Sequence, residues 1–497
     1  MQAQSGETAH FMNSRNAHYW LLASFAVLCL LLVPWSAIGA SWRECDTQSM
    51  ARSLAFEDFD VLHPRVNWRG DTDGSVEAEM PVYQALTALT MRWCGDVEWP
   101  GRAWSLLATL VGGLALHRLL RSSTGSPGAA SAGLAAYLVS GSVVLTSCRV
   151  MPDALSVALC LIGLAMFDRM LRGGRPQGWL WVGAMVCTVF GCLAKPTSLQ
   201  VVAIQFGWLL ALAPRQIRNW RVLAVLVVPT VLTMSWMLHA ASIGAETGLT
   251  FGVLRAGDSK LPHLKHLLAP GLFVGLAWTA VQFGPGVAGC ASFLGLAVRR
   301  RFVWLDLAVT APVVLALIAT LRYSSSGGMG PHYHQWAAVA GAWFVARWWS
   351  VRNGPLTAWL ICALVVVTAV WSFARERSAV RTAASASILE VASDLQAATK
   401  PGELVVVRSP KQRVDDYWQR RNNYEDPVVL YHARRFGWVI PSDEFTPDVL
   451  AVLLRDGAKA IVDFAPDRVD DATREWLAAH TTLVGECAGG RVLRVNP

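Results

Sequence analysis

Long apolar segments separated by short polar connections occupy the first three quarters of the chain. The first covers residues 19–40, and an α-helix of that length, at about 1.5 Å per residue, crosses the roughly 30 Å hydrocarbon core of a bilayer. Further segments follow near residues 101–120, 127–147, 152–170, 177–194, 197–213, 221–240, 270–297, 302–321, 335–350 and 355–374. The pattern predicts a polytopic α-helical membrane protein with about eleven transmembrane helices.

The small residues at 37–39 also resemble the cleavage site of a secretory signal peptide. The apolar segment before them is long for a signal peptide, and many further segments follow it. We therefore expect an uncleaved membrane anchor.

The composition agrees with a membrane protein. Hydrophobic residues make up 54% of the 497 residues and charged residues only 16%, whereas soluble domains carry roughly 25% charged residues. The 23 Trp residues fit as well, because Trp is enriched at both membrane interfaces. The net charge of +8 arises from short Arg clusters without a contiguous basic face, which argues against nucleic acid as a partner.

The Arg clusters between the apolar segments predict the orientation in the membrane, because positive residues collect on the cytoplasmic side. If the polar tail 1–18 is cytoplasmic, one side of the membrane holds Arg118, Arg121, Arg169, Arg172, Arg175, Arg215, Arg218, Arg221, Arg299, Arg300, Arg301, Arg347 and Arg352. The segment 41–98 and the C-terminal residues 376–497 then face the extracytoplasmic side of the cell (inner or plasma) membrane.

Residues 376–497 have a different pattern, with more charge and shorter apolar runs. Runs of strand length occur at 403–407, 426–431, 459–464 and 491–495. A helix is predicted between Thr446 and Gly457, and strands alternating with helices indicate a small α/β domain. The chain thus divides into the tail 1–18, a transmembrane domain 19–375 and this extracytoplasmic domain.

The segment 41–98 carries the densest acidic cluster, with eleven Asp and Glu against five Arg. In a chain that is otherwise mostly membrane helix, this is where we expect the chemistry. Asp46 lies six residues after the first span, and Glu77 and Glu79 precede Pro81. Each also has an ordinary interpretation: Asp46 as the N-cap of the following helix, and the two Glu as carboxylates that favour the start of the next helix.

Further polar residues are predicted on the same side: Arg149, Lys195, Arg322, Tyr323, His332, Tyr333 and His334. Charged residues near membrane depth are candidates for function, although a Lys at a helix end also reaches for the interface without one. We expect the two His to hydrogen-bond an anionic or sugar group. Two His without a third ligand are a weak indication of a metal, so a divalent metal stays open but unsupported, and no cofactor is certain.

The ten Cys residues include no CxxC pair. Most lie inside apolar runs, where a thiol is usually a small hydrophobe. Cys45 and Cys94 flank the acidic segment and are candidates for a disulfide if that segment faces an oxidising compartment.

The predicted topology brings acids and cations from separate loops to one face of the membrane domain. They are Asp46, Glu79, Arg149, Lys195, His332 and His334. Such a site suits a substrate with a phosphate head and a lipid tail. The cations would hold the phosphate, and a carboxylate would remove the proton of an attacking hydroxyl.

The order of motifs resembles that of a known family. After one span come ECDTQSMARSLAF, LHPRVNWRG, VEAEMPVYQALTAL, WPGRAWSLL, RVMPDALSVAL, LAKPTSLQ, GPHYHQW and PVVLYHARRFGWVIP. In this order they resemble the GT-C glycosyltransferases that use polyprenyl-phosphate-linked sugars, in the family-39 branch of protein O-mannosyltransferases and lipid A aminoarabinose transferases. The resemblance covers nearly the whole chain.

The resemblance implies roles for individual residues. Asp46 matches the catalytic base at the start of the first outer loop, and Glu79 matches the acid before the Pro of the second loop helix. Arg149 and Lys195 fall where such proteins recognise the lipid phosphate. We add as substrate-binding candidates Glu44, Glu77, His63, Arg65, Arg322, Tyr323, His332, Tyr333 and His334. Glu44 and Asp46 straddle a Cys instead of forming the adjacent acidic pair of the mannosyltransferases, so the choice of base, and a protein as acceptor, stay open.

These residues predict a membrane glycosyltransferase that moves a sugar from a polyprenyl-phosphate donor to an envelope acceptor (lipid, glycan or protein) by an inverting displacement. Two alternatives stay open: a transporter or flippase, although no internal repeat is visible, and a non-catalytic binder of lipid-linked sugars. The C-terminal domain recognises the acceptor or covers the active-site cavity. Its candidate contacts are Tyr431, Arg434, Arg435 and Trp438, although a Tyr and a Trp on short strands usually belong to the core.

Overall fold

The computed structural model describes residues 16–33, 35, 38–173, 178–251, 270–320, 330–351, 355–384, 387–414, 422, 424–487 and 489–497. Two compact units make up the chain. The helical unit consists of residues 1–34, 101–236 and 260–378, and the sheet unit of residues 35–100, 237–259 and 379–497. Each unit is assembled from segments that lie far apart in the sequence.

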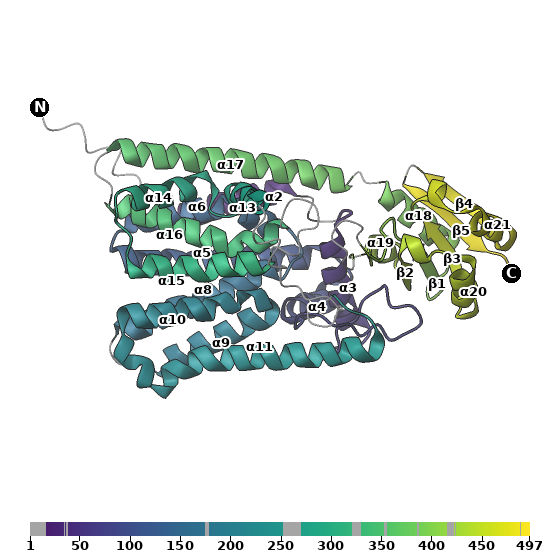
Figure 1. Ribbon diagram of the computed structural model, residues 1–497, viewed down its shortest axis with the longest axis horizontal. Coiled ribbons are helices and arrows are strands. Elements are labelled where there is room, and N and C mark those ends of the chain that lie inside the picture. Colours follow the sequence, from purple (N-terminus) through teal and green to yellow (C-terminus); the bar gives the residue numbers. More distant parts are fainter. Residues whose placement is uncertain are drawn as a thin grey trace, which may run out of the picture. The chain divides into compact units, whose positions relative to one another are not determined.

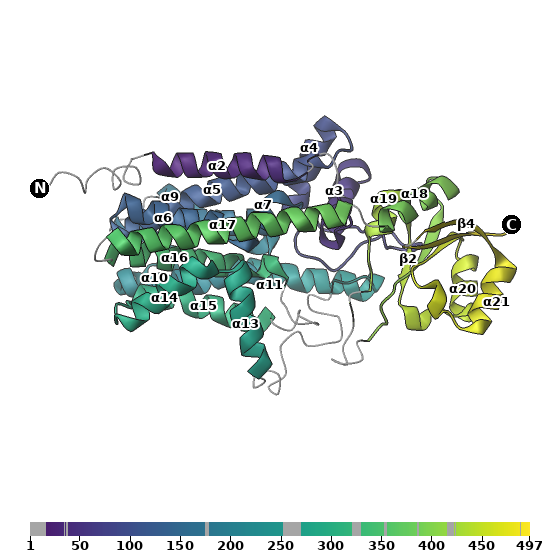
Figure 2. The ribbon, with the colours of Figure 1, turned by 90° about the horizontal axis from the view of Figure 1, so that it is seen from above.

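Helices build the helical unit, and Figures 1 and 2 show most of them side by side and roughly parallel. They are α2 (Ala17–Leu32), α5 (Trp99–Thr124), α6 (Pro127–Leu138), α7 (Gly141–Cys148), α8 (Asp153–Arg172), α9 (Gly178–Ala194), α10 (Gln200–Leu212), α11 (Trp220–Thr247), α13 (Pro270–Phe283), α14 (Gly286–Val298), α15 (Trp304–Thr320), α16 (Gln335–Val351) and α17 (Pro355–Ala384), with the short 3-10 turns η1 (Pro196–Leu199), η2 (Pro214–Arg218) and η4 (Pro331–His334). Helices α11 and α17 expose many Leu, Val and Trp side chains, which suits contact with lipid.

The lengths and composition of the helices confirm a polytopic membrane protein. Among the described residues, four helices are long and apolar enough to cross a membrane: Trp99–Thr124, Asp153–Arg172, Trp220–Thr247 and Pro355–Thr382. Two bent pairs raise the number to six if each pair is one span. Shorter apolar helices lie at Ala17–Leu32, Gly178–Ala194, Pro196–Leu212 and Trp304–Ile318. The number of about eleven spans stays a prediction.

Two segments that the sequence predicts as single helices are broken. The segment 127–147 forms α6 and α7, which meet at 65°, and the segment 270–297 bends by 119° at its break. Pro285 lies in this second break, where its missing N–H interrupts helical hydrogen bonding. In the first, a Cβ on Gly141 would lie 2.5 Å from the carbonyl oxygen of Gln282, so only a glycine allows this close approach of α7 and α13.

The sheet unit contains a five-stranded sheet in the order β2-β1-β3-β5-β4. Its strands are β1 (Leu404–Arg408), β2 (Phe436–Ile440), β3 (Ala458–Asp463), β4 (Thr481–Cys487) and β5 (Gly490–Val495), and its helices are α3 (Trp42–Phe56), α4 (Val82–Cys94), α18 (Ile388–Ala398), α19 (Val428–Ala433), α20 (Pro447–Arg455) and α21 (Asp471–His480). β2 and β3 pair in parallel with β1, whereas β5 runs antiparallel to β3 and β4.

Alternate residues of β1 pack on opposite faces of the sheet, as the two-residue period of a strand requires. Val405 and Val407 belong to a core that also includes Met50 and Trp68 of the acidic segment. Val406 belongs to a second core, formed with residues of α20 and α21. The acidic segment and the C-terminal sheet therefore share one hydrophobic core.

One predicted strand is a helix. The run 426–431 contributes to α19, because the Asp426 carboxylate accepts a hydrogen bond from the Val428 N–H (3.0 Å) and Pro427 occupies the N-cap position. The helix ends at Arg434, whose backbone adopts the left-handed conformation (φ 54°), and β2 follows. Local polar capping outweighs the β-branched composition of the run.

Two buried Asp residues tie the helices of the helical unit together. Each accepts from an indole, from a guanidinium and from a third donor. The donors to Asp168 on α8 are Trp208 (2.8 Å), Arg172 (2.8 Å) and Ser122 (2.7 Å), and those to Asp306 on α15 are Trp343 (2.7 Å), Arg347 (3.3 Å) and the Val303 N–H (2.8 Å). The rings of the two Trp residues meet edge to face at 5.1 Å, so one connected network spans α8, α10, α15 and α16.

Replacing Asp306 by Asn should destabilise the fold. The amide carries no charge for Arg347 and turns an NH2 group toward other donors, and a buried polar group left without a partner costs about 1–3 kcal/mol. We expect a clear drop in the midpoint of thermal unfolding of the purified protein in detergent. The control is Asp471→Asn, because Asp471 is 90% exposed and exposed ion pairs contribute little. Equal midpoints for the two variants would contradict the importance of the network.

Candidate functional site

Two buried Asp side chains keep a carboxylate oxygen without a hydrogen-bond donor. Among the described residues, the buried carboxylate oxygens without a hydrogen-bond partner are Oδ2 of Asp46 and Oδ2 of Asp153. Asp168, Asp306 and Asp463 are equally buried, yet donors reach both oxygens of each. An unsatisfied buried polar group costs about 1–3 kcal/mol, and more when charged. A fold that keeps two such oxygens is expected to use them.

Asp46 lies inside α3, one turn after the helix begins at Trp42, so its ordinary interpretation as an N-cap is wrong. Its side chain is fully buried. Oδ1 accepts a hydrogen bond from Trp68 Nε1 at 3.0 Å, and Oδ2 has no donor. The Trp68 ring stands edge-on to Phe251, with 5.5 Å between the centroids. Burial raises the pKa of Asp46 well above its usual value, and the Trp68 hydrogen bond opposes this rise.

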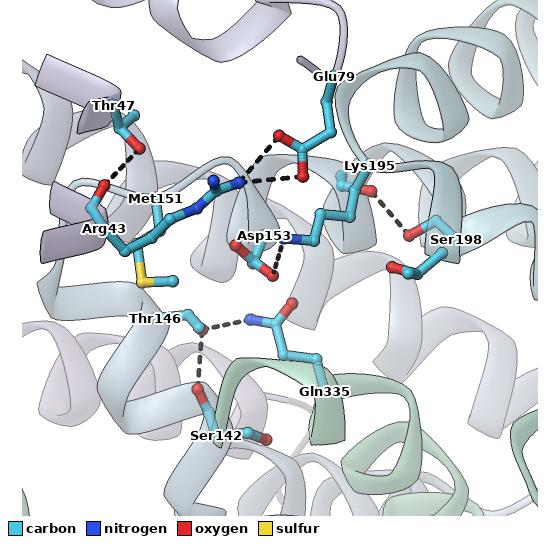
Figure 3. Close-up of polar contacts among 12 residues, drawn as sticks. Arg43, Thr47, Glu79, Ser142, Thr146, Met151, Asp153, Lys195, Ser198 and Gln335 are labelled. Carbon is cyan, nitrogen blue, oxygen red and sulfur yellow. Dashed lines mark hydrogen bonds and ion pairs between the residues drawn. The ribbon is translucent and has the colours of Figure 1, made fainter. Parts of the chain in front are cut away.

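Arg43 links Asp46 to the second predicted acid. It lies one helical turn before Asp46, and its Nη2 is 3.0 and 2.9 Å from the two carboxylate oxygens of Glu79 (Figure 3). The positive charge of Arg43 also acts against the raised pKa of Asp46. The structure thus places Glu79 against Arg43, whose charge also acts on Asp46.

Glu77, the other acid before Pro81, makes contacts that hold the fold together. Its side chain is fully buried, and it accepts a short hydrogen bond from the Thr250 hydroxyl. Its backbone bonds to Leu249 (3.0 Å) and Phe251 (3.1 Å). Glu77 therefore fastens residues 249–251 to the acidic segment, a long-range contact that a position before a helix does not reveal.

The remaining candidates of the acidic segment have buried or local surroundings. Glu44 is buried on α3. His63 hydrogen-bonds Asp60 (2.6 Å) and Arg65 lies 3.8 Å from Asp58. These are short-range ion pairs within the loop.

Cys45 and Cys94 do not form the disulfide considered from the sequence. Both are free thiols, Cys45 buried and Cys94 exposed. Cys45 Sγ lies 3.8 Å from the Gly39 carbonyl and from His432 Nε2. Burial raises the pKa of this thiol, so Cys45 is an inert packing residue.

The C-terminal residues that were candidates for contact with the acceptor make contacts within the sheet unit. Tyr431 donates to Glu98 (2.8 Å), Arg434 pairs with Asp96 (3.1 Å), Arg435 donates to Thr399 (2.8 Å), and Trp438 packs against Gly70. For Tyr431 and Trp438 the ordinary interpretation as core residues agrees with these positions.

A pocket in the helical unit is lined in part by Asp153, which carries the second oxygen without a donor. Lys195, directly after α9, lies with Nζ 3.2 Å from Oδ1 of Asp153 at the start of α8 (Figure 3). The pocket has about 390 Å³ of space, part of which is open to solvent, and its lining includes Asp153, Lys195, Ser198, His332, Tyr333 and Gln335. Sequence reasoning selected Lys195, His332 and Tyr333. It missed Asp153 and Gln335, because an Asp after Pro and a Gln after a loop look like ordinary helix starts.

Arg149 has an acidic partner in the fold. Its Nε donates to the Glu376 carboxylate of α17 at 2.8 Å, so this cation is balanced within the helical unit. Arg375 is exposed, and its guanidinium carbon lies 3.8 Å from the ring centroid of Phe283. Two Arg and one Glu give this group, the Arg149 cluster, a net positive charge, which suits an anionic ligand.

The two His candidates differ in their surroundings. His334 is fully buried, with neither ring nitrogen hydrogen-bonded, and its ring stacks on Phe283 at 5.9 Å. His332 lines the pocket. In the part of the chain that the structure describes, no group of three or more His, Cys, Asp or Glu is placed to hold a metal ion. Arg322 and Tyr323 lie outside the described residues.

The predicted site residues thus form two groups. The sheet unit holds Asp46 and Glu79, joined by Arg43. The helical unit holds Lys195 in the pocket and the Arg149 cluster. The meeting of the two groups in one site stays a prediction.

A family model and several solved structures match the chain. The family model, described as dolichyl-phosphate-mannose-protein mannosyltransferase, matches residues 78–239. This range covers the end of the acidic segment and most of α4 to α11. No curated protein matches the sequence.

The solved structures extend the likeness to nearly the whole chain. ArnT from Cupriavidus metallidurans, bound to undecaprenyl phosphate, matches with 97% of this chain and 100% of its own covered, at TM-score 0.63 and 14% identity. The archaeal oligosaccharyltransferase AglB from Archaeoglobus fulgidus matches with 96% and 74% covered, at TM-score 0.55 and 10% identity. The arabinofuranosyltransferase AftD from Mycobacteria matches with 97% and 40% covered, at TM-score 0.53 and 13% identity.

The fold is that of the GT-C membrane glycosyltransferases. Together with the family match, it confirms the resemblance that the order of motifs indicated, and it confirms the predicted class of enzyme, a membrane glycosyltransferase. At identities of 10–14% the solved structures define the fold alone. The roles of individual residues must come from the chemistry of this chain.

Asp46→Asn should stabilise the protein at neutral pH. The pKa of Asp46 is raised above its usual 3.8 in the folded state. The carboxyl therefore contributes fully to the free energy of unfolding below pH 3.8, and this contribution is lost as the pH rises through the folded pKa. The amide does not ionise, so the unfolding midpoint of the variant should gain on that of wild type as the pH rises from about 4 through the folded pKa of Asp46.

The matched comparison is Asp463→Asn in the same unit. Asp463 is equally buried but pairs with Arg408 and Arg491, each at 3.0 Å. Its replacement should lower the unfolding midpoint at neutral pH. A difference between Asp46→Asn and wild type that stays constant with pH would contradict the raised pKa.

Proposed function

We propose that the protein transfers a sugar from a polyprenyl-phosphate-linked donor to a hydroxyl of an envelope acceptor, on the extracytoplasmic face of the membrane. One observation carries this proposal: Asp46 is buried, with one oxygen held by Trp68 and the other without a donor. This is the arrangement of a general base. The relatives support the donor class, because the family model is named for dolichyl-phosphate mannose, and ArnT and AglB were solved with undecaprenyl phosphate and a dolichol-phosphate.

In the proposed reaction the acceptor hydroxyl gives its proton to Oδ2 of Asp46 as its oxygen attacks the anomeric carbon. The new C–O bond forms on the face opposite the phosphate. The bond from the anomeric carbon to the phosphate oxygen breaks, so the configuration inverts, by the same geometry as in inverting glycosidases. The raised pKa brings Asp46 closer to the operating pH, where a general base is most effective.

The free oxygen also favours Asp46 over Glu44 as the base. Both acids are buried on α3, but only Asp46 keeps a buried carboxylate oxygen without a donor among the described residues of the sheet unit. Glu79 holds Arg43 beside Asp46 and thereby limits how far the pKa of the base rises. We assign Glu79 the role of a positioning residue.

The leaving phosphate needs positive charge and no general acid, because it departs as an anion. The Arg149 cluster has a net positive charge and an exposed guanidinium on Arg375. Lys195, the other predicted cation, is paired with Asp153. We therefore assign the phosphate of the donor to the Arg149 cluster.

We further propose the arrangement in the membrane that the Arg clusters indicate. About eleven helices cross the inner or plasma membrane, the tail 1–18 is cytoplasmic, and residues 376–497 are extracytoplasmic. The shared core of Met50 and Trp68 with the strands of the sheet supports one point of this arrangement. The acidic segment and the C-terminal region must lie on the same side.

Asp46→Asn should lower the rate of sugar transfer about 10²–10⁴-fold, because the amide cannot accept the proton of the acceptor. The assay follows release of labelled sugar from a panel of polyprenyl-phosphate monosaccharides by purified protein in detergent, with and without an envelope extract as acceptor. Asp71→Asn is the matched control, since Asp71 is an exposed acid of the same segment.

Acceptor-dependent release by wild type and by Asp71→Asn, lost in Asp46→Asn, is the expected result. Binding of the lipid-linked sugar by wild type without any release would favour a receptor or a flippase instead. An Asp46→Asn protein that retains most of the wild-type rate would refute Asp46 as the base.

The rate of transfer should rise with pH through the raised pKa of Asp46, since only the carboxylate form accepts a proton. Trp68→Phe removes the hydrogen bond that lowers this pKa, so the midpoint of the pH profile should move to higher pH. The other charges that act on Asp46 come from Arg43, Asp426 and Glu425, and the variant leaves them in place. A slower enzyme with an unmoved midpoint would mean that Trp68 only supports packing.

A further inference from the structure

The pocket around Asp153 has the wrong charge balance for a phosphate site. Lys195 and Asp153 form an ion pair at 3.2 Å, and their side chains are only 6% and 3% exposed. An ammonium and a carboxylate so paired have no net charge. The described lining residues therefore offer no excess of positive charge to an anion, in contrast to the Arg149 cluster.

The polar atoms left over in the pocket are acceptors. Among its described lining residues, the buried side-chain atoms without a hydrogen-bond partner are Asp153 Oδ2, Gln200 Oε1 and Gln335 Oε1. Carboxylate and carbonyl oxygens can only accept. A ligand that satisfies them must bring O–H or N–H donors, and a phosphodiester has none.

The orientation of Gln335 is fixed by its neighbour. The Thr146 hydroxyl donates to the Ser142 carbonyl at 2.8 Å, so it has only lone pairs to offer to Gln335. It accepts a short hydrogen bond from Gln335 Nε2, which turns the Gln335 carbonyl oxygen the other way. Figure 3 shows this oxygen pointing toward the Lys195–Asp153 pair.

Other parts of the lining are already satisfied or apolar. Ser198 Oγ accepts from Trp336 Nε1 (3.2 Å) and shares a hydrogen bond with Ser156 (2.7 Å). Val157 and Val313 add apolar surface. A few fixed acceptors combined with apolar lining suit a ligand that has hydroxyl groups at its edge and C–H groups on its faces.

We propose that this pocket binds hydroxyl groups of the donor sugar. Asp153 and Gln335 accept hydrogen bonds from the hydroxyls, and Lys195 faces the sugar instead of the phosphate. The free Asp153 oxygen disfavours a sugar with its own carboxylate, so the substrate class is an uncharged sugar with free hydroxyls. The inference rests on the proposed function and deepens it.

Comparing the binding of two lipids, one with the sugar and one without it, distinguishes contacts to the sugar from contacts to the phosphate. Purified protein in detergent is titrated with bare polyprenyl phosphate and with the polyprenyl-phosphate monosaccharide that wild type uses, and binding is followed by tryptophan fluorescence. Gln335→Leu should weaken binding of the sugar-bearing lipid about 3- to 10-fold. It should leave the affinity for bare polyprenyl phosphate unchanged.

Asp153→Asn is the second variant. It should weaken binding of the sugar-bearing lipid about tenfold or more, because hydrogen bonds to a charged acceptor are the stronger ones. It leaves Lys195 without its counter-charge, so affinity for bare polyprenyl phosphate should not fall. Gln335→Leu changes no charge, and it keeps the test valid if Asp153→Asn is unstable.

The matched control is Gln205→Leu. Gln205 is also a buried Gln in the helical unit, with Oε1 unsatisfied and Nε2 bonded to Thr188 at 3.0 Å, but it does not line the pocket. Both lipids should bind this variant as they bind wild type. A donor that lacks the contacted hydroxyl should bind wild type more weakly and lose no further affinity in Gln335→Leu.

The outcomes separate the inference from the proposed function. If wild type binds and uses the donor, but Gln335→Leu weakens both lipids equally, the pocket holds the phosphate and the inference is wrong. Unchanged binding of both lipids in Gln335→Leu and Asp153→Asn would also overturn it. Wild type that binds neither lipid would overturn the proposed function, and the inference with it.

Discussion

A carboxylate removed from water must find hydrogen-bond donors inside the protein, and both units depend on this requirement. Asp168, Asp306 and Asp463 meet it in full, with Arg, Trp, Ser or backbone donors on both oxygens. They join helices or strands that are distant in sequence. Asp46 and Asp153 meet it only in part. The same physical constraint thus separates residues that hold the fold together from residues that keep an oxygen without a donor, the two for which we propose a ligand.

Trp68 connects the stability of the sheet unit with its chemistry. Its ring belongs to the core that β1 shares with the acidic segment, and its indole N–H holds one oxygen of Asp46. A side chain fixed by packing on a sheet can orient a catalytic group more accurately than a loop residue could. This gives a physical reason for a C-terminal sheet in an enzyme whose proposed base lies near the N-terminus: the sheet supports the residue that positions the base.

The sequence predicted what depends on local pattern and left open what depends on contacts between distant segments. The helical membrane class follows from the lengths of the apolar segments, and the strand β1 from a short apolar run. The catalytic role of Asp46 stays a prediction. The helix α19 was missed because one Asp426 cap outweighs a β-branched run. The hydrogen bond of Arg149 to Glu376 was not predicted, since nothing local points to a residue 227 positions away. Asp153 and Gln335 were missed for the same reason, because their significance lies in which of their oxygens remain unsatisfied.

The two cationic positions of the helical unit differ in net charge, and the proposed reaction needs that difference. Departure of a phosphate is assisted by excess positive charge at the leaving oxygen, which the Arg149 cluster supplies. Excess positive charge beside the sugar would instead provide a second place for the phosphate to bind, and the donor could then bind in an unproductive orientation. A neutral Lys195–Asp153 pair avoids this while still offering acceptors to hydroxyl groups. Specificity for the orientation of the donor therefore follows from where charge is neutralised as much as from where it is present.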